Sequence, residues 1–194
     1  MPSDALIFDC DGTLIDSMPG HYVAWSEVMA TYGITFDEDR FYKLGGIPSN
    51  KICVLLASEQ GIEIDGDAAA RKKEEAFLRH LPMLEPIPRV IEIARQNRGV
   101  KKMAVASGGY RRVIELQLRH LQIEDWFDTI VCAEDTARHK PEPDVFLEAA
   151  RRMGVPPERC TVYEDADLGV EAARRAGMQC IDVREFHVPK RVTR

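Results

Sequence analysis

One stretch near the start of the chain, residues 5–17 with the sequence ALIFDCDGTLIDS, constrains the fold more than any other. The apolar residues 6–8 predict a buried strand of the kind found inside parallel sheets. Asp9 then falls at the carboxyl end of this strand, where open α/β sheets bind their ligands. Gly12 permits a tight turn that brings Asp11 back over the same place. The stretch therefore predicts a polar site at one edge of a parallel sheet.

Two carboxylates this close repel each other unless a cation binds or one of them keeps its proton. A magnesium ion could hold Asp9 ionised, because hard cations bind oxygen ligands and often use one or two carboxylates. Asp11 could then give and take a proton. The alternative is an ordinary strand end, at which both aspartates bond to backbone groups of the turn. The Thr-Leu pair that follows the turn, and partners elsewhere in the chain, favour a catalytic site.

The pattern of apolar residues divides the chain into a helical part and an alternating part. From residue 17 to 84 the periodicity is helical, with Ser49 expected to cap the third helix. After Pro86 helices and strands alternate, which predicts right-handed crossovers and a parallel sheet covered on both faces. The expected fold class is α/β, a doubly wound parallel-sheet (Rossmann-like) core of residues 1–16 and 85–194 with a small helical cap, residues 17–84, inserted after the first strand. Later helices are expected over 89–97, 111–121, 143–153 and 168–176, later strands over 103–106, 129–133, 160–163 and 178–183, and cap helices near 22–32, 38–44, 49–61 and 67–81.

Two further strand ends carry groups suited to a phosphate. Ser107 and Gly108 follow the second strand and precede a helix, so a hydroxyl and open backbone amides could form an anion cradle. Lys140 follows the third strand, and Pro141 fixes its loop. A lysine held at this edge could neutralise Asp9 and phosphoryl oxygens. A serine-capped loop and a solvated lysine are the alternatives.

The fourth strand is followed by three acids, Glu164, Asp165 and Asp167. Asp165, with Glu164, would complete a magnesium shell begun by Asp9 and the backbone carbonyl of Asp11. Asp167 is expected to cap the next helix instead. The alternative is that all three acids simply face the positive end of that helix dipole.

Taken in order, the Asp-x-Asp-Gly-Thr-Leu segment, the serine loop, the Lys-Pro loop and the acidic pair resemble the four motifs of the haloacid dehalogenase-like hydrolases. The resemblance covers essentially the whole chain, and the most similar subgroup contains β-phosphoglucomutase and the small sugar-phosphate phosphatases. It implies that Asp9 is the nucleophile, that Asp11 is the general acid/base, and that Ser107 binds the transferring phosphate. It also implies that His21, one helical turn past Ser17, faces the substrate and the acid/base.

Charge and cysteine content limit the partners and the compartment. The formal net charge of −6 argues against a nucleic acid or an anionic membrane held by bulk charge. No apolar run approaches membrane-spanning length, and the N-terminus shows no signal-peptide pattern. Five cysteines without a Cys-x-x-Cys pair favour a reducing compartment. We therefore expect a cytoplasmic protein, a monomer, that acts on a small phosphorylated metabolite, with a solvated basic tail that starts at Arg184 and includes Lys190, Arg191 and Arg194.

The four motifs and the resemblance that they carry predict a phosphatase that uses Mg2+ to hydrolyse a small phosphomonoester through an aspartyl-phosphate on Asp9. The resemblance implies that the substrate is a sugar phosphate. A metal-free dehalogenase would need neither Asp11 nor the acidic pair. A phosphonate hydrolase would need a cap lysine that forms an imine, for which Lys43 and Lys51 are candidates by residue type only. A binding protein without activity should have lost at least one of the four motifs, and none is damaged.

The main alternative is a sugar phosphomutase of the β-phosphoglucomutase type. Such an enzyme must also hold the phosphate that is not reacting, and in the mutases that this chain resembles a cap loop supplies a lysine and an arginine. Here that loop covers residues 44–51, with Gly45 at the lysine position and Ser49 at the arginine position. We expect Gly45 and Gly46 to border the substrate, Lys51 to be the nearest cation, and water to intercept the phosphoenzyme.

Overall fold

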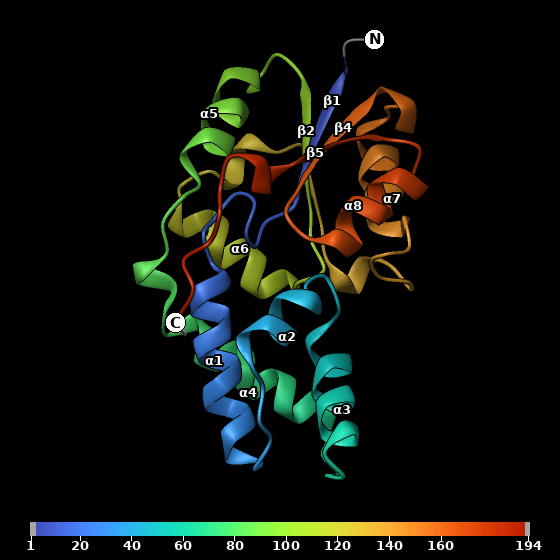
Figure 1. Ribbon diagram of the computed structural model, residues 1–194. Coiled ribbons are helices and arrows are strands. Elements are labelled where there is room, and N and C mark those ends of the chain that lie inside the picture. Colours follow the sequence, from blue (N-terminus) through green and yellow to red (C-terminus); the bar gives the residue numbers. More distant parts are fainter. Residues whose placement is uncertain (1–2, 193–194) are drawn as a thin grey trace.

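The computed structural model describes residues 3–192 and contains a five-stranded sheet. Its order is β3-β2-β1-β4-β5, and each neighbouring pair of strands is parallel, so the first strand lies at the centre (Figure 1). This arrangement confirms the expected doubly wound α/β core. The strands are β1 (Ala5–Phe8), β2 (Lys102–Ala106), β3 (Thr129–Val131), β4 (Cys160–Glu164) and β5 (Gln179–Asp182).

Both faces of the sheet are covered by helices. Leu6 and Phe8 of β1 pack into one apolar layer with α5 and α6, whereas Ala5 and Ile7 pack into a second layer with α7 and α8. A strand that is buried on both faces reads as a continuous apolar run, which is why residues 6–8 show no alternation. The helices are α5 (Pro88–Asn97), α6 (Arg111–His120), α7 (Asp144–Met153) and α8 (Asp167–Arg175).

Four helices follow β1 and form a separate layer beyond the carboxyl ends of the strands (Figure 1). α4 packs against both α1 and α3, so this cap has an apolar centre of its own. Because every β-strand points its carboxyl end toward the cap, residues at those ends face it. The cap helices are α1 (Met18–Thr31), α2 (Glu38–Lys43), α3 (Ser49–Glu59) and α4 (Gly66–Leu78).

Two local predictions in the cap were wrong. The helix expected over 67–81 ends at Leu78, before a short 3-10 turn that contains Pro82. Ser49 does not cap α3 but is its first residue. Its hydroxyl donates to Glu74 Oε1 at 2.6 Å instead, so it joins two cap helices rather than satisfying a backbone amide.

Two local predictions in the core were also wrong. The strand expected over 129–133 stops at Val131, because the Asp135 carboxylate accepts a hydrogen bond from the Cys132 backbone N–H at 2.7 Å and bends the chain into a 3-10 turn. Asp167 does not cap α8 but is its first residue, and its carboxylate pairs with Arg184 at 2.7 Å.

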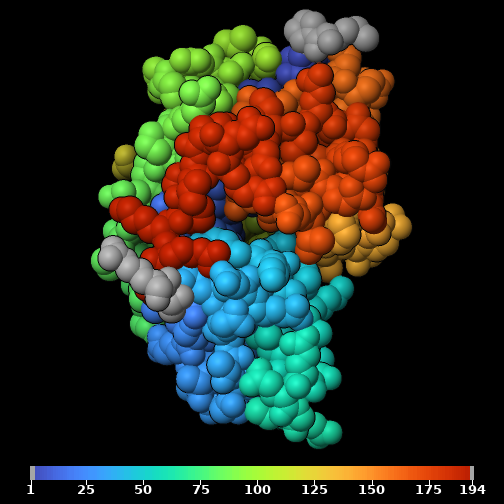
Figure 2. Space-filling view, in the orientation of Figure 1, coloured from blue at the N-terminus to red at the C-terminus, as the bar shows by residue number. Residues whose placement is uncertain are grey.

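The basic tail is exposed at Arg184, Lys190 and Arg191, as expected, but over the residues that the structure describes it also contacts the cap. After β5 and a 3-10 turn the chain runs back to the cap, and Figure 2 shows this segment lying across the junction of core and cap. We call residues 186–192 the C-terminal strap; Arg194 lies outside the described residues. The strap contacts α2 through Val192 and Arg191. The Val192 N–H donates to Glu38 Oε1 at 2.8 Å. Arg191 pairs with Asp39 at 3.1 Å, and its guanidinium lies 4.2 Å from the centroid of the Tyr42 ring.

None of the helices within residues 3–192 is both long and apolar enough to cross a lipid bilayer.

Candidate active site

The turn after β1 brings Asp9 and Asp11 to the same cavity, which lies between the sheet edge and the cap. Gly12 makes this turn with φ of +78°, a conformation that residues with a Cβ rarely adopt. A Cβ at Gly12 would also lie 2.2 Å from Asp165 Oδ2. Glycine is therefore required here both by the backbone angle and by the acid packed against it.

Three acids meet at this edge of the sheet. Oxygens of Asp9, Glu164 and Asp165 lie within 4.8 Å of one another. Lys140 Nζ donates to Asp9 at 2.8 Å and to Glu164 at 3.2 Å, and all three of these side chains are buried. Thr13 Oγ1 donates to Asp165 at 2.9 Å. The lysine and the hydroxyl hold the carboxylates in place but leave three acids beside one ammonium group.

Burial and mutual repulsion make this cluster costly while it is ionised. Burial, followed by the Asp9 charge, raises the pKa of Asp165 to about 8 and the pKa of Glu164 well above its usual value. Burial also raises the pKa of Asp9, against the opposing effect of Lys140. Oxygen ligands without a thiolate or an imidazole are the donors that magnesium prefers. The cluster therefore fits a hard divalent cation, which would relieve the repulsion.

Asp11 has different surroundings. Its Oδ1 accepts hydrogen bonds from Ser17 Oγ at 2.6 Å and from His21 Nε2 at 2.8 Å. The other ring nitrogen of His21, Nδ1, lies 2.8 Å from Lys73 Nζ, and the ring stacks on Phe77 with centroids 3.6 Å apart. A charged lysine has no acceptor, so Lys73 donates to Nδ1 and the ring proton on Nε2 points at Asp11.

This chain of donors favours the ionised form of Asp11. Burial alone would raise the pKa of Asp11, but the adjacent His21 imidazole with its hydrogen bond, the Ser17 hydroxyl and the more distant Lys73 charge lower it below its usual value. Asp11 also lies outside the cluster of three acids whose oxygens come together. The two aspartates of one motif therefore differ, one surrounded by acids and an ammonium group, the other by hydrogen-bond donors.

The serine loop lies where the core meets the cap. Ser107 is buried, its backbone N–H donates to the Val131 carbonyl at 3.0 Å, and its Oγ accepts from the Gly109 N–H at 3.1 Å. A Cβ at Gly108 would lie 3.1 Å from the Gly46 carbonyl oxygen, so the core loop and the cap loop touch through glycines. Ser107, Gly108 and Gly46 all line the cavity.

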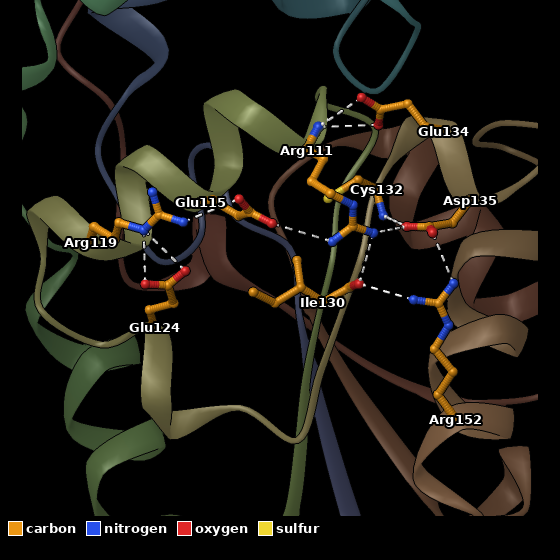
Figure 3. A network of polar contacts seen from close by, with 9 residues as sticks. All are labelled: Arg111, Glu115, Arg119, Glu124, Ile130, Cys132, Glu134, Asp135 and Arg152. Carbon is orange, nitrogen blue, oxygen red and sulfur yellow. Dashed lines mark hydrogen bonds and ion pairs between the residues drawn. The ribbon is translucent and has the colours of Figure 1, made fainter.

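A polar network holds the helix that follows this loop (Figure 3). The Arg111 backbone N–H, at the start of α6, donates to both carboxylate oxygens of Glu134 at 3.0 and 3.1 Å. The Arg111 guanidinium pairs with Asp135, and Arg152 pairs with the same carboxylate at 2.9 Å. Both arginines also donate to the Ile130 carbonyl. The network fixes the N-terminus of α6 against the turn after β3.

The cap wall of the cavity contains residues that the sequence analysis missed. Gly45 and Gly46 line it, whereas Lys51 is exposed and is not among the lining residues. Among the described cap residues that line the cavity the lysine is Lys73, with Glu74 beside it. The remaining cap side chains at the cavity are Met18, His21, Trp25, Phe41, Leu44, Ile47, Ser49 and Ile52.

A sequence signal for Lys73 did exist. It lies four residues after Ala69 and four before Phe77, two positions expected on the apolar face of that helix. Lys73 is 3% exposed in the structure, about as buried as its apolar neighbours. A lysine at an apolar position of a helix is a candidate for a buried polar site.

The comparisons with known proteins agree with this geometry. The sequence profile of the haloacid dehalogenase-like hydrolases matches residues 6–183. The chain belongs to this family. The resemblance stated from the four motifs is thereby confirmed.

Two curated relatives and one solved structure illustrate the similarity. The chain is 41% identical over 180 residues to a fructose-1-phosphate phosphatase of Escherichia coli strain K12, covering 92% of this chain and 95% of that protein. It is 30% identical over 182 residues to a phosphorylated carbohydrates phosphatase of Thermotoga maritima, covering 92% of this chain and 83% of that protein. It superposes on the structure of a β-phosphoglucomutase from Clostridium difficile with a TM-score of 0.85 and 26% identity, covering 94% of this chain and 84% of the other.

Proposed function

We propose that this chain is a magnesium-dependent phosphatase that hydrolyses a small sugar monophosphate through a phosphoryl group carried on Asp9. The observation that supports this best is the difference between the two aspartates that share the cavity. Asp9 contacts the Lys140 ammonium and two further acids, as a metal-assisted nucleophile requires. Asp11 contacts Ser17 and His21, as a proton-transfer group requires.

In the first step an oxygen of Asp9 attacks phosphorus and the bond from phosphorus to the sugar oxygen breaks. The sugar oxygen takes a proton from Asp11. Asp11 binds this proton when the phosphate dianion arrives, because the nearby negative charge raises the pKa of Asp11. Lys140, the Ser107 hydroxyl and the loop amides stabilise the phosphoryl oxygens. Asp9, Glu164, Asp165 and the backbone carbonyl of Asp11 would hold magnesium, which supplies charge neutralisation at the phosphoryl group.

In the second step water attacks phosphorus and the bond to Asp9 breaks. Asp11, now ionised, takes the proton from that water and releases it to solvent as inorganic phosphate leaves, so both aspartates return to their starting states. His21 and Ser17 hold the Asp11 carboxylate in place throughout. The cap limits access of bulk water during the first step.

The substrate class rests on the relatives and on the cavity. One relative is named for fructose 1-phosphate and another for phosphorylated carbohydrates. The cap wall offers a hydroxyl on Ser49 and a carboxylate on Glu74, which are groups that bind sugars.

The test is phosphate release over a panel of sugar monophosphates, nucleoside monophosphates and small acid phosphates, with Asp9→Asn as the control. We expect the parent to have its highest kcat/KM for a sugar monophosphate, and we expect no phosphate release by Asp9→Asn. Equal activity of Asp9→Asn, or release only from nucleotides, would contradict the proposal.

A phosphomutase is the second candidate, because a β-phosphoglucomutase superposes on the chain. Against it stands the cap loop, where Gly45 and Gly46 line the cavity and offer no charged side chain for a second phosphate. Incubation with β-glucose 1-phosphate and a catalytic amount of its bisphosphate separates the two candidates. We expect inorganic phosphate rather than glucose 6-phosphate; efficient isomerisation with little phosphate release would favour the mutase.

A further inference from the structure

A carboxylate on the cap wall, Glu74, lies at the cavity and has no part in the proposed mechanism. Its side chain is 13% exposed. Glu74 Oε1 accepts from Ser49 Oγ at 2.6 Å, and Lys73 Nζ lies 3.2 and 3.3 Å from its two oxygens. A carboxylate held by partners on two helices keeps a fixed position at the cavity wall.

The charges on the cap wall cancel each other. Among the described residues that line the cavity, the cap supplies one lysine and one glutamate, Lys73 and Glu74, and these two pair with each other. His21 accepts a hydrogen bond from Lys73 on Nδ1, so it adds no positive charge. The remaining lining groups of the cap are apolar side chains, glycines and the Ser49 hydroxyl. The wall that faces the leaving group therefore carries no net positive charge.

We propose that Glu74 determines specificity: it selects neutral, hydroxyl-bearing leaving groups and rejects those that carry a second phosphate or a carboxylate. This inference rests on the proposed phosphatase function and names its substrate class more narrowly. The carboxylate accepts hydrogen bonds from sugar hydroxyls, and charge-assisted bonds of this kind are strong. A second anion at the same wall meets a like charge in a largely buried site and finds the Lys73 ammonium already paired.

The competing explanation is that Glu74 only joins the cap helices through Ser49 and Lys73. In that case replacing it would lower stability or turnover to the same extent for every substrate. A role in specificity instead changes the ratio between substrates that differ only at the end remote from the reacting phosphate. The ratio is therefore the quantity to measure.

The experiment compares the parent, Glu74→Gln and Glu75→Gln with fructose 1-phosphate and fructose 1,6-bisphosphate as a matched pair. Glutamine keeps the shape of the side chain and removes the charge, and Glu75 is an exposed glutamate next along the same helix. We expect the parent to prefer the monophosphate in kcat/KM by about tenfold or more, as a like charge opposite the second phosphate would produce. The preference should fall about tenfold in Glu74→Gln and stay unchanged in Glu75→Gln.

Calorimetry on the Asp9→Asn background, where no turnover occurs, gives the corresponding ratio of the binding affinities for the two sugar phosphates. An unchanged ratio in Glu74→Gln, in kinetics and in binding, would overturn the inference. Absence of phosphate release from every compound would overturn the proposed function instead, and the calorimetric ratio would still decide the role of Glu74.

Discussion

At the scale of single residues, the site uses one motif to place two aspartates in opposite environments. Asp9 lies beside Lys140 and within an acid cluster, whereas Asp11 receives two hydrogen bonds on one oxygen. The first arrangement suits a nucleophile beside a cation, and the second suits a group that exchanges a proton with the leaving oxygen and with water. Replacing one aspartate at a time therefore affects different steps of the reaction.

Asp11→Asn should lower kcat for a sugar phosphate by roughly two to four orders of magnitude, because the poor leaving group loses its proton donor. With para-nitrophenyl phosphate, whose leaving group needs no proton, a rapid burst of nitrophenol should survive while the steady state stays slow. Stopped-flow absorbance measures both phases. Equal losses in the burst and in the steady state would remove Asp11 from its acid role.

Magnesium should stabilise the fold as well as support activity, because Asp9, Glu164 and Asp165 repel one another without it. A ligand at a hundred times its Kd contributes about 2.7 kcal/mol to the free energy of unfolding. We expect Mg2+ to raise Tm of the parent and of Asp167→Asn, whose carboxylate is exposed, but to have little effect on Asp165→Asn. Chelation should abolish phosphate release. An equal rise of Tm in all three proteins would place the metal elsewhere.

Residues at strand ends were predictable, and residues of the cap wall were less so. Asp9, Ser107, Lys140 and Asp165 each follow an apolar strand, and parallel strands bring their carboxyl ends to one edge. Lys73 depends on how a separate layer of helices closes over that edge, which no local pattern specifies. Its position on an apolar helix face was visible in the sequence, but its contact with His21 was not.

At the scale of elements, the serine loop depends on the helix that follows it. Four backbone N–H groups at the start of any helix need partners, and at the start of α6 Glu134 accepts from one of them. This contact ties the loop that carries Ser107 to the turn after β3 (Figure 3). The sequence predicted both elements, but it predicted a strand where that turn lies, because the apolar residues continue past Val131.

Glu134→Ala should lower the free energy of unfolding by about 1 kcal/mol, as loss of a helix N-cap does. It should also weaken inhibition by inorganic phosphate, because the loop amides lose their support. The matched control is Glu124→Ala, which removes an exposed partner of Arg119 and should change neither the stability appreciably nor the phosphate inhibition. Thermal unfolding and inhibition kinetics measure the two effects. Identical phosphate inhibition in both variants would show that the network serves the fold alone.

At the scale of the whole molecule, the cap is closed over the core. The cavity measures about 100 Å3, less than the roughly 300–1,000 Å3 of a typical ligand pocket, so a sugar phosphate needs the cap to move before it enters. The C-terminal strap joins the end of the core to α2 and so opposes that movement. The sequence could not show this, because Val192 and Glu38 are 154 positions apart and no local pattern links them.

Arg191→Ala should favour the open cap, since it removes an exposed ion pair and a cation–π contact worth about 0.5–1 kcal/mol together. We expect amide hydrogen exchange in α2 to speed up roughly two- to fivefold, the ratio that this energy corresponds to, because the open form becomes more populated. Lys190→Ala, which replaces an exposed neighbour, is the control. Unchanged exchange in α2 would mean that the strap does not hold the cap.

The central claim is that a phosphoryl group is carried on Asp9 during turnover. The most direct measurement is peptide mass spectrometry of the Asp11→Asn variant, quenched in acid while it turns over para-nitrophenyl phosphate with magnesium. We predict one phosphoryl group on the peptide that contains Asp9, and none when Asp9→Asn is added to the same variant. A phosphoryl group on another residue, or none on the Asp11→Asn protein during a confirmed burst, would contradict the account.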